Sequence, residues 1–201
     1  ACSIEKAVAF ATFSNFLGPG DEEPNQALAK RIRNEDRLKG FGVIDFSRED
    51  LEDQVEAIYQ LGFPGIKLHP AFQHFRIDGE KAFRVYAAAQ KRDLFLTFHT
   101  GIHWHRISDY NVLLFDEVAY HFKNLRFSME HVGGYCFFLD AVAVMQNNQK
   151  DPPRIYAGLT SVFDKESNRF WYQDDQRIHD LLWQTGEEAS IFGLDFPYNN
   201  A

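Results

Sequence analysis

Four short apolar runs of the sequence end on a residue that can bind a metal ion or transfer a proton. These residues are His69 in GIKLHP, His99 in FLTFHTG, His131 in MEHVGG and Asp195 in IFGLDFPY. Imidazole and carboxylate groups suit divalent transition metals such as zinc, manganese or iron. Such a metal lowers the pKa of a bound water, and a nearby histidine or aspartate can carry the proton. The set therefore predicts metal-assisted chemistry.

Alternation within each run predicts where these side chains point, because residues two apart in a strand share a face. Lys67 shares a face with His69, opposite two apolar residues. The same rule places His99 and Asp195 opposite the apolar residues of their own strands. The alternative is that all four are merely polar residues at loop edges, but their recurrence at four strand ends argues against it.

The run LRFSMEH, residues 125–131, alternates less regularly than the others. In an extended strand His131 aligns with Met129 and Phe127. This register predicts that Ser128 and Glu130 lie on the opposite side, against the helix layer.

Strand-like and helical segments alternate along the whole chain. Strands are predicted over residues 6–13, 38–46, 65–69, 94–99, 125–131, 154–159 and 190–195, and helices over about 25–34, 47–61, 80–91, 111–122, 137–146 and 174–184. Strict alternation predicts parallel strands joined by right-handed crossovers. A doubly wound sheet and a (β/α)₈ barrel both fit, although the barrel needs one more strand. In either fold, functional groups gather at the carboxyl ends of the strands.

Composition restricts the class of partner. The 201 residues are 45% hydrophobic with a formal net charge of −8, which fits one domain over residues 1–201 and disfavours nucleic acid or an anionic membrane surface. The sequence has no membrane-spanning run and no signal peptide. Cys2 and Cys136 give no disulfide framework, so we expect a cytoplasmic protein. The expected partner is a small-molecule substrate, and assembly into a homo-oligomer is an open alternative.

In their order and spacing, the four motifs resemble the strand-end motifs of the amidohydrolase-related family, from about Lys6 to Tyr198. Members are metal-dependent TIM-barrel hydrolases and decarboxylases of the amidohydrolase superfamily. The resemblance implies an α/β fold, the (β/α)₈ TIM barrel, with His99 and Asp195 as metal ligands. It also implies catalytic roles: His131 positions or deprotonates water or substrate, and Asp195 shuttles a proton.

The resemblance also implies a substrate pocket that includes His69 and Lys67. A carboxylated lysine bridges two metals in some amidohydrolases, but we expect Lys67 to fill the lumen or form an ion pair. Trp104 is expected to bind substrate from a loop, together with His103 and His105; the alternative is that these two histidines replace missing metal ligands. Five aromatic residues could either line an apolar pocket or belong to the core: Trp104, Tyr110, Phe163, Trp171 and Tyr198.

The sequence departs from the family pattern at both ends. The family's first strand carries a His-x-His pair that binds metal, whereas residues 1–20 contain no histidine. The chain also stops shortly after Asp195, where the family continues into a final helix. We therefore expect a TIM barrel that lacks its first strand and final helix.

The expected function is that of a metal-dependent hydrolase. We expect it to act on a small carboxylated or cyclic substrate through a metal-activated water, with zinc as the metal and manganese as the alternative. Nonoxidative decarboxylation at the same site stays open. A non-catalytic barrel without a metal stays open as well.

Overall fold

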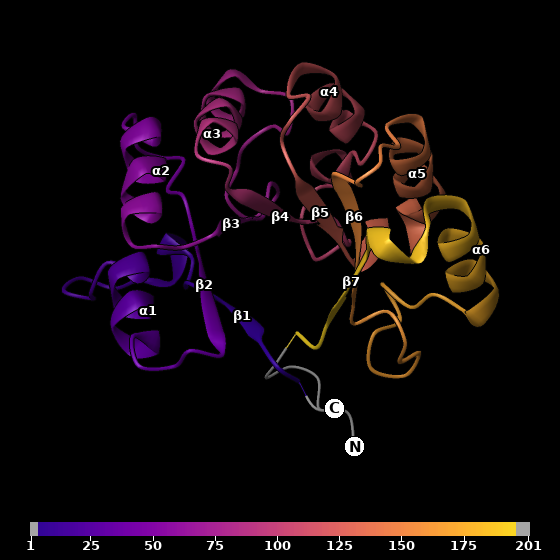
Figure 1. The fold of residues 1–201 in the computed structure, drawn as a ribbon, viewed down its shortest axis with the longest axis horizontal. Coiled ribbons are helices and arrows are strands. Elements are labelled where there is room, and N and C mark those ends of the chain that lie inside the picture. The colour runs from indigo at the N-terminus through magenta and orange to yellow at the C-terminus, as the bar shows by residue number, and fades with distance from the viewer. Residues whose placement is uncertain (1–3, 196–201) are drawn as a thin grey trace.

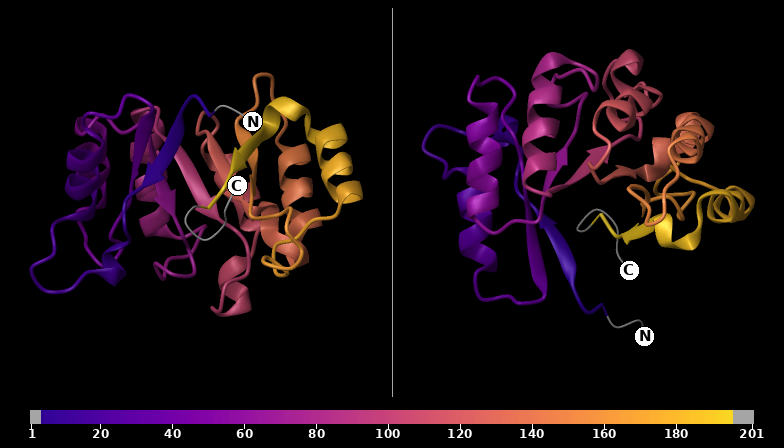
Figure 2. Two further views of the ribbon diagram at one scale, coloured as in Figure 1. Left: turned by 90° about the horizontal axis from the view of Figure 1, so that it is seen from below. Right: turned by 45° about the horizontal axis from the view of Figure 1, so that its top comes forward.

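The computed structural model describes residues 4–195, in which seven strands form a single sheet. The strands are β1 (Ala7–Phe10), β2 (Leu38–Gly42), β3 (Gly65–Leu68), β4 (Phe95–His99), β5 (Phe127–Glu130), β6 (Ile155–Thr160) and β7 (Ser190–Gly193). Neighbours in sequence are neighbours in space, and all pairs are parallel. The sheet curls into an open barrel with helices on its convex side (Figures 1 and 2). The predicted fold class is confirmed.

Six α-helices lie between the strands. They are α1 (Pro24–Ile32), α2 (Leu51–Gln60), α3 (Glu80–Lys91), α4 (Leu114–His121), α5 (Gly134–Asn147) and α6 (Asp175–Thr185). The α2 helix begins later than predicted because the carboxylate of Asp45 accepts hydrogen bonds from Ser47 N and Oγ, at 3.0 and 2.6 Å. Within residues 4–195, every helix is too short or too polar to cross a bilayer.

The main core lies between the outer face of the sheet and the helices. The fully buried Leu68, Phe98 and Phe127 of β3, β4 and β5 pack there, each contributing about 1.5–3 kcal/mol through burial. Aromatic rings fill the other side of the sheet near the amino ends of the strands, where Phe95 contacts Tyr156 with ring centroids 5.6 Å apart. Polar side chains occupy the carboxyl end of the lumen, where the candidate site lies.

The predicted orientation of β5 is wrong, because Ser128 and Glu130 face the lumen. Ser128 Oγ donates to Glu130 Oε1 at 2.6 Å, and Thr160 Oγ1 of β6 donates to Glu130 Oε2 at 2.6 Å. The strand ends at Glu130, and His131 has a φ of +64°. This left-handed residue turns its imidazole back toward the lumen, so strict alternation no longer applies.

Candidate metal centre

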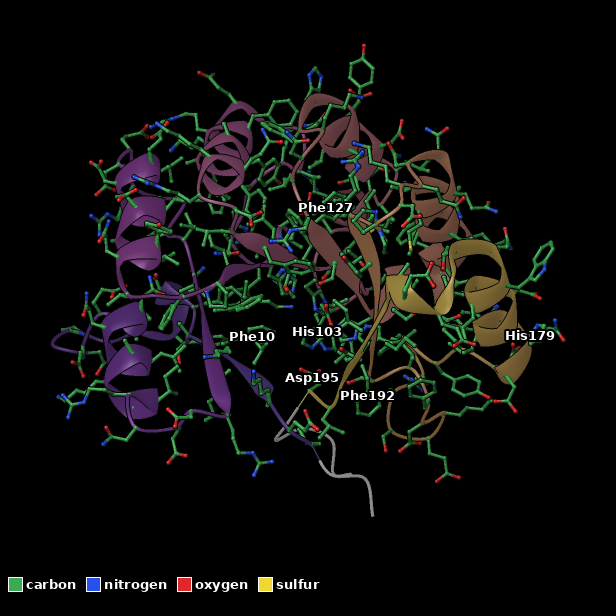
Figure 3. All side chains as sticks on the ribbon, in the orientation of Figure 1. Phe10, His103, Phe127, His179, Phe192 and Asp195 are labelled. Carbon is green, nitrogen blue, oxygen red and sulfur yellow. The ribbon has the colours of Figure 1, made fainter. Side chains whose placement is uncertain are left out.

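Three imidazoles meet beyond the carboxyl ends of β3 and β4. One ring nitrogen from each of His69, His99 and His103 lies within 4.8 Å of those of the other two. The His69 and His99 rings stack with centroids 4.0 Å apart and an interplanar angle of 15°. His69 and His99 are buried, whereas His103 is exposed and lies within the curve of the sheet (Figure 3). The strand ends supply two of these groups and the following loop supplies the third.

A chain of hydrogen bonds determines which nitrogen of His99 is free. His131 Nδ1 lies 2.7 Å from Thr160 O, and His131 Nε2 lies 3.1 Å from His99 Nδ1. Since a carbonyl oxygen only accepts, His131 carries its proton on Nδ1 and its Nε2 accepts from His99 Nδ1. His99 Nε2 is then unprotonated, and it is buried with no partner among the described residues. An orphaned basic nitrogen in this position fits a metal ligand.

His69 is fixed by the segment that follows β3. Its backbone N–H donates to Gln73 Oε1 at 2.7 Å, and Gln73 Nε2 donates in turn to Ile44 O at 2.7 Å. Its Nδ1 accepts from Phe72 N at 3.3 Å, which is longer than an ordinary hydrogen bond. This weak contact leaves the His69 ring able to exchange Phe72 N for a metal ion.

The loop after β4 is held by the buried hydroxyl of Tyr110. His103 N donates to this oxygen at 2.9 Å, and the hydroxyl donates to His103 O at 2.8 Å. Both polar groups of the His103 backbone are thereby fixed. The two bonds place the imidazole beside His99, with ring centroids 6.1 Å apart.

Burial keeps the imidazoles of the site neutral. It lowers the pKa of His69 to about 2 and the pKa of His131 to about 3, and the charge of Lys67 acts in the same direction on both. It also lowers the pKa of His99 well below its ordinary value, with His69 as the next contribution. Neutral imidazole is the form that binds metals, so the donor set fits a divalent transition metal at neutral pH.

Asp195 lies apart from this group of three, within the curve of the sheet (Figure 3). Its Oδ2 accepts from Ser161 Oγ at 3.3 Å. Partial desolvation and the nearby His105 lower the pKa of His103, and the carboxylate of Asp195 opposes this shift. The structure therefore brings His69 and His103 together with His99 in one ligand group. Asp195 lies near enough to this group to affect the protonation of His103.

Lys67 lies deeper in the lumen than His69. Burial lowers its pKa, opposed by the charges of Glu130 and Asp195, and its Nζ lies 5.1 Å from the Phe10 ring centroid. Trp104 is 79% exposed and contacts Phe170 edge-on at 5.5 Å. Tyr198 lies outside the described residues.

Glu130, Thr160 and the stacking role of Trp171 were missed by sequence reasoning. Glu130 had a signal in the sequence, because Ser128 and Glu130 alternate with apolar residues in FSME. The position of Trp171 had no signal in the sequence, because its indole reaches His131 from the loop between β6 and α6. The two ring centroids lie 4.0 Å apart.

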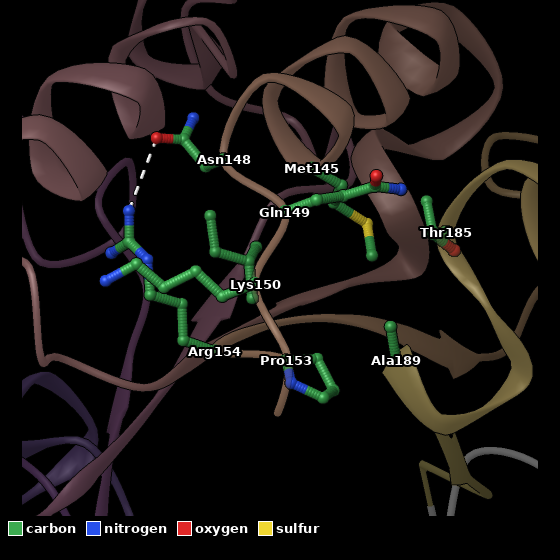
Figure 4. A pocket seen from close by; sticks show the side chains of 9 residues that line it. Met145, Asn148, Gln149, Lys150, Pro153, Arg154, Thr185 and Ala189 are labelled. Atoms are coloured by element: carbon green, nitrogen blue, oxygen red, sulfur yellow. Dashed lines mark hydrogen bonds between the residues drawn. The ribbon is translucent and has the colours of Figure 1, made fainter.

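A hollow of about 380 Å³ lies beyond the carboxyl ends of β1, β2 and β3. It is lined by Ser14, Asn15, Ile44, Asp45, Phe46, Ser47, Gln73 and His74, and its volume suits a small molecule. A second cavity lies at the opposite ends of the strands, beside Arg154 and Asn148 (Figure 4). Its volume of about 20 Å³ holds one water at most, so the first hollow is the candidate substrate site.

Comparison with known proteins gives one family match and several similar folds. The family model described as Amidohydrolase matches residues 6–201. An uncharacterized TIM-barrel protein from Bordetella bronchiseptica has a TM-score of 0.76 at 17% identity, over 97% of this chain and 66% of that chain. A putative 2-pyrone-4,6-dicarboxylic acid hydrolase from Pseudomonas putida has a TM-score of 0.66 at 15% identity, over 98% and 68%. No curated protein matches the chain.

A 5-carboxyvanillate decarboxylase from Novosphingobium aromaticivorans, complexed with manganese, has a TM-score of 0.63 at 16% identity. The match covers 87% of this chain and 59% of that chain. At such identities the likeness shows the TIM-barrel fold alone. The chain spans 59–68% of the length of these three structures.

Proposed function

Because the chain belongs to the amidohydrolase family, we propose that it is a metal-dependent hydrolase acting on a small carboxylated or cyclic substrate. The observation that carries the proposal is the buried Nε2 of His99, which has no hydrogen-bond partner among residues 4–195 and lies beside nitrogens of His69 and His103. Three imidazoles with an open fourth position are typical of a catalytic zinc site. Zinc is therefore the proposed metal, and manganese is the alternative.

A metal held by these three histidines would lower the pKa of a bound water and polarise a substrate carbonyl. The chain's own residues supply the remaining functions. Asp195 is the proposed proton acceptor, because its carboxylate acts electrostatically on both His103 and Lys67. His131 orients His99 through its Nε2, and it can accept a proton itself only after it releases that bond.

The hollow of about 380 Å³ is the proposed substrate site. Gln73 lines it and also accepts a hydrogen bond from His69 N, which connects the hollow to the ligand group. Lys67 from the lumen and Trp104 from the loop after β4 are proposed substrate contacts. A buried lysine amine suits a substrate carboxylate, and an exposed indole suits the face of a ring.

Nonoxidative decarboxylation is the second candidate reaction. It is favoured by the lysine in the lumen, which can hold one carboxylate while the proposed metal site receives another polar group of the substrate. The two reactions need the same histidines and differ in their products. Labelled water distinguishes them, since hydrolysis incorporates ¹⁸O into the product and decarboxylation releases CO₂.

The test measures metal content and turnover in the same preparations. We expect the protein to bind about one zinc or manganese per chain by elemental analysis, and to turn over at least one compound from a panel of small carboxylated aromatics, lactones and amides. His99→Ala should lose both properties. His179→Ala is the matched control, because this histidine lies on the outer side of α6 (Figure 3) with its side chain 75% exposed. Equal metal content in the two variants would contradict the proposed ligand set.

A further inference from the structure

Trp171 packs against the histidines of the site from the loop between β6 and α6. Its indole stacks on the His131 imidazole with centroids 4.0 Å apart and an interplanar angle of 21°. The same indole meets His99 and His103 edge-on, each with centroids 5.7 Å away. One side chain therefore contacts two of the three proposed ligands and the histidine that orients one of them.

The indole is fixed by a hydrogen bond at its edge. Trp171 Nε1 donates to Ile102 O at 2.9 Å, and Trp171 N donates to Asn168 O at 2.8 Å. The first bond joins the loop after β6 to the loop after β4. It holds the ring beside the same short segment that carries His103.

Two glycines of the strand-end motifs make room for the indole. A Cβ at Gly101, two residues after His99 in FHTG, would lie 2.5 Å from Trp171 Nε1. A Cβ at Gly134, in the motif EHVGG, would lie 3.2 Å from Trp171 Cδ1. Both distances are shorter than an ordinary carbon contact of about 3.5–4.0 Å. The backbone of the loops after β4 and β5 therefore packs directly against this ring.

The stacked indole restricts rotation of the His131 ring. His131 keeps its hydrogen bonds to Thr160 O and His99 Nδ1 only in its present orientation. Those bonds keep the proton of His99 on Nδ1 and leave Nε2 bare toward the ligand group. Without the indole, His131 can turn away and the two tautomers of His99 become comparable.

From this geometry we propose that Trp171 is a positioning residue for the proposed metal site. The metal-binding measurement described below rests on the proposed function. The indole holds His131 against His99 and thereby presents His99 Nε2 as a ligand. Trp171 itself touches no reacting group. Its effect passes through His131 to His99, and through the Ile102 contact to the loop that carries His103.

The first measurement uses the metal-free protein. Long-range ¹H–¹⁵N NMR of the imidazoles should show His131 and His99 both protonated on Nδ1 in the wild type. Trp171→Ala should give a mixture of tautomers for His99, whereas Trp171→Phe, which keeps an aromatic face, should restore most of the Nδ1 form. Trp183→Ala is the control, because Trp183 on α6 is 79% exposed, and should match the wild type. An unchanged His99 spectrum in Trp171→Ala overturns the positioning role, whether or not a metal binds.

The second measurement is a titration with Co²⁺ as the probe. We expect Trp171→Ala to weaken Co²⁺ binding by about 10- to 100-fold, the range typical of groups that orient a ligand, and Trp171→Phe to weaken it by a smaller factor. If Trp171→Ala does not fold, Gly101→Ala displaces the indole instead and should give the same loss. Absence of Co²⁺ binding by the wild type contradicts the proposed function and leaves the NMR result to decide the role of Trp171. Binding of equal strength by wild type and a folded Trp171→Ala overturns the role.

Discussion

The substitution Gly158→Ala is expected to destabilise the protein by acting on one buried carboxylate. Gly158 of β6 lies opposite Glu130 of β5 in the parallel register. A Cβ at position 158 would lie 2.5 Å from Glu130 Cδ and Oε1 and 2.6 Å from Oε2. Ordinary contacts need about 3.5 Å or more, so the carboxylate has to move by about 1 Å.

The cost follows from the hydrogen bonds that hold this carboxylate. Glu130 is 8% exposed, and it accepts from Ser128 Oγ and Thr160 Oγ1, each at 2.6 Å. Hydrogen bonds to a charged group contribute about 1.5–3 kcal/mol each, so loss of both costs about 3–6 kcal/mol. Replacing glycine restricts the unfolded chain and returns about 0.4–1 kcal/mol. The expected net loss in the free energy of unfolding is about 2–6 kcal/mol.

Urea unfolding followed by circular dichroism measures this loss, and a double-mutant cycle tests its cause. In a Glu130→Ala background the clash is absent, so Gly158→Ala should change the free energy of unfolding by less than about 1 kcal/mol. Gly18→Ala is the control, since its Cβ would lie 3.6 Å from the nearest atom. An equal cost of Gly158→Ala with and without the Glu130 carboxylate would refute the steric reasoning.

Three further predictions address the remaining polar groups. The folded-state pKa of His69 is about 2, below the unfolded value of about 6.5, so the unfolded state binds more protons between these two pH values. The free energy of unfolding of the metal-free protein should therefore fall by up to about 1.4 kcal/mol per pH unit through this group as the pH drops below 6.5. His69→Gln should flatten the pH profile of urea unfolding. His103→Ala should weaken zinc binding at least tenfold in a competition assay while His105→Ala stays within about threefold, because only His103 belongs to the ligand group; equal losses contradict this. Tyr86→Phe should leave the free energy of unfolding unchanged or raise it, because the buried hydroxyl has no partner among residues 4–195 and an unpaired buried hydroxyl is destabilising. A decrease of more than about 1 kcal/mol in the free energy of unfolding would show that the hydroxyl does have a partner.

The sequence by itself determined the alternation of parallel strands with helices and the direction of two of the site's residues. Alternation with period two in GIKLH and LFLTFH placed His69 and His99 on the inner face, because an extended backbone repeats its direction locally. The position at the carboxyl ends followed from the parallel arrangement. These inferences depend on residues adjacent in the chain, so no tertiary information was needed.

Tertiary structure alone decided how the remaining groups meet. His131 leaves the strand with a positive φ, so its direction depends on the turn and on the indole of Trp171 rather than on strand parity. His103 joins the ligand group because Tyr110 fixes its backbone. The hydrogen bond from Trp171 to Ile102 O spans 69 positions of the chain. Loop residues have no local repeat, so their placement follows from such distant contacts, which only the folded chain brings together.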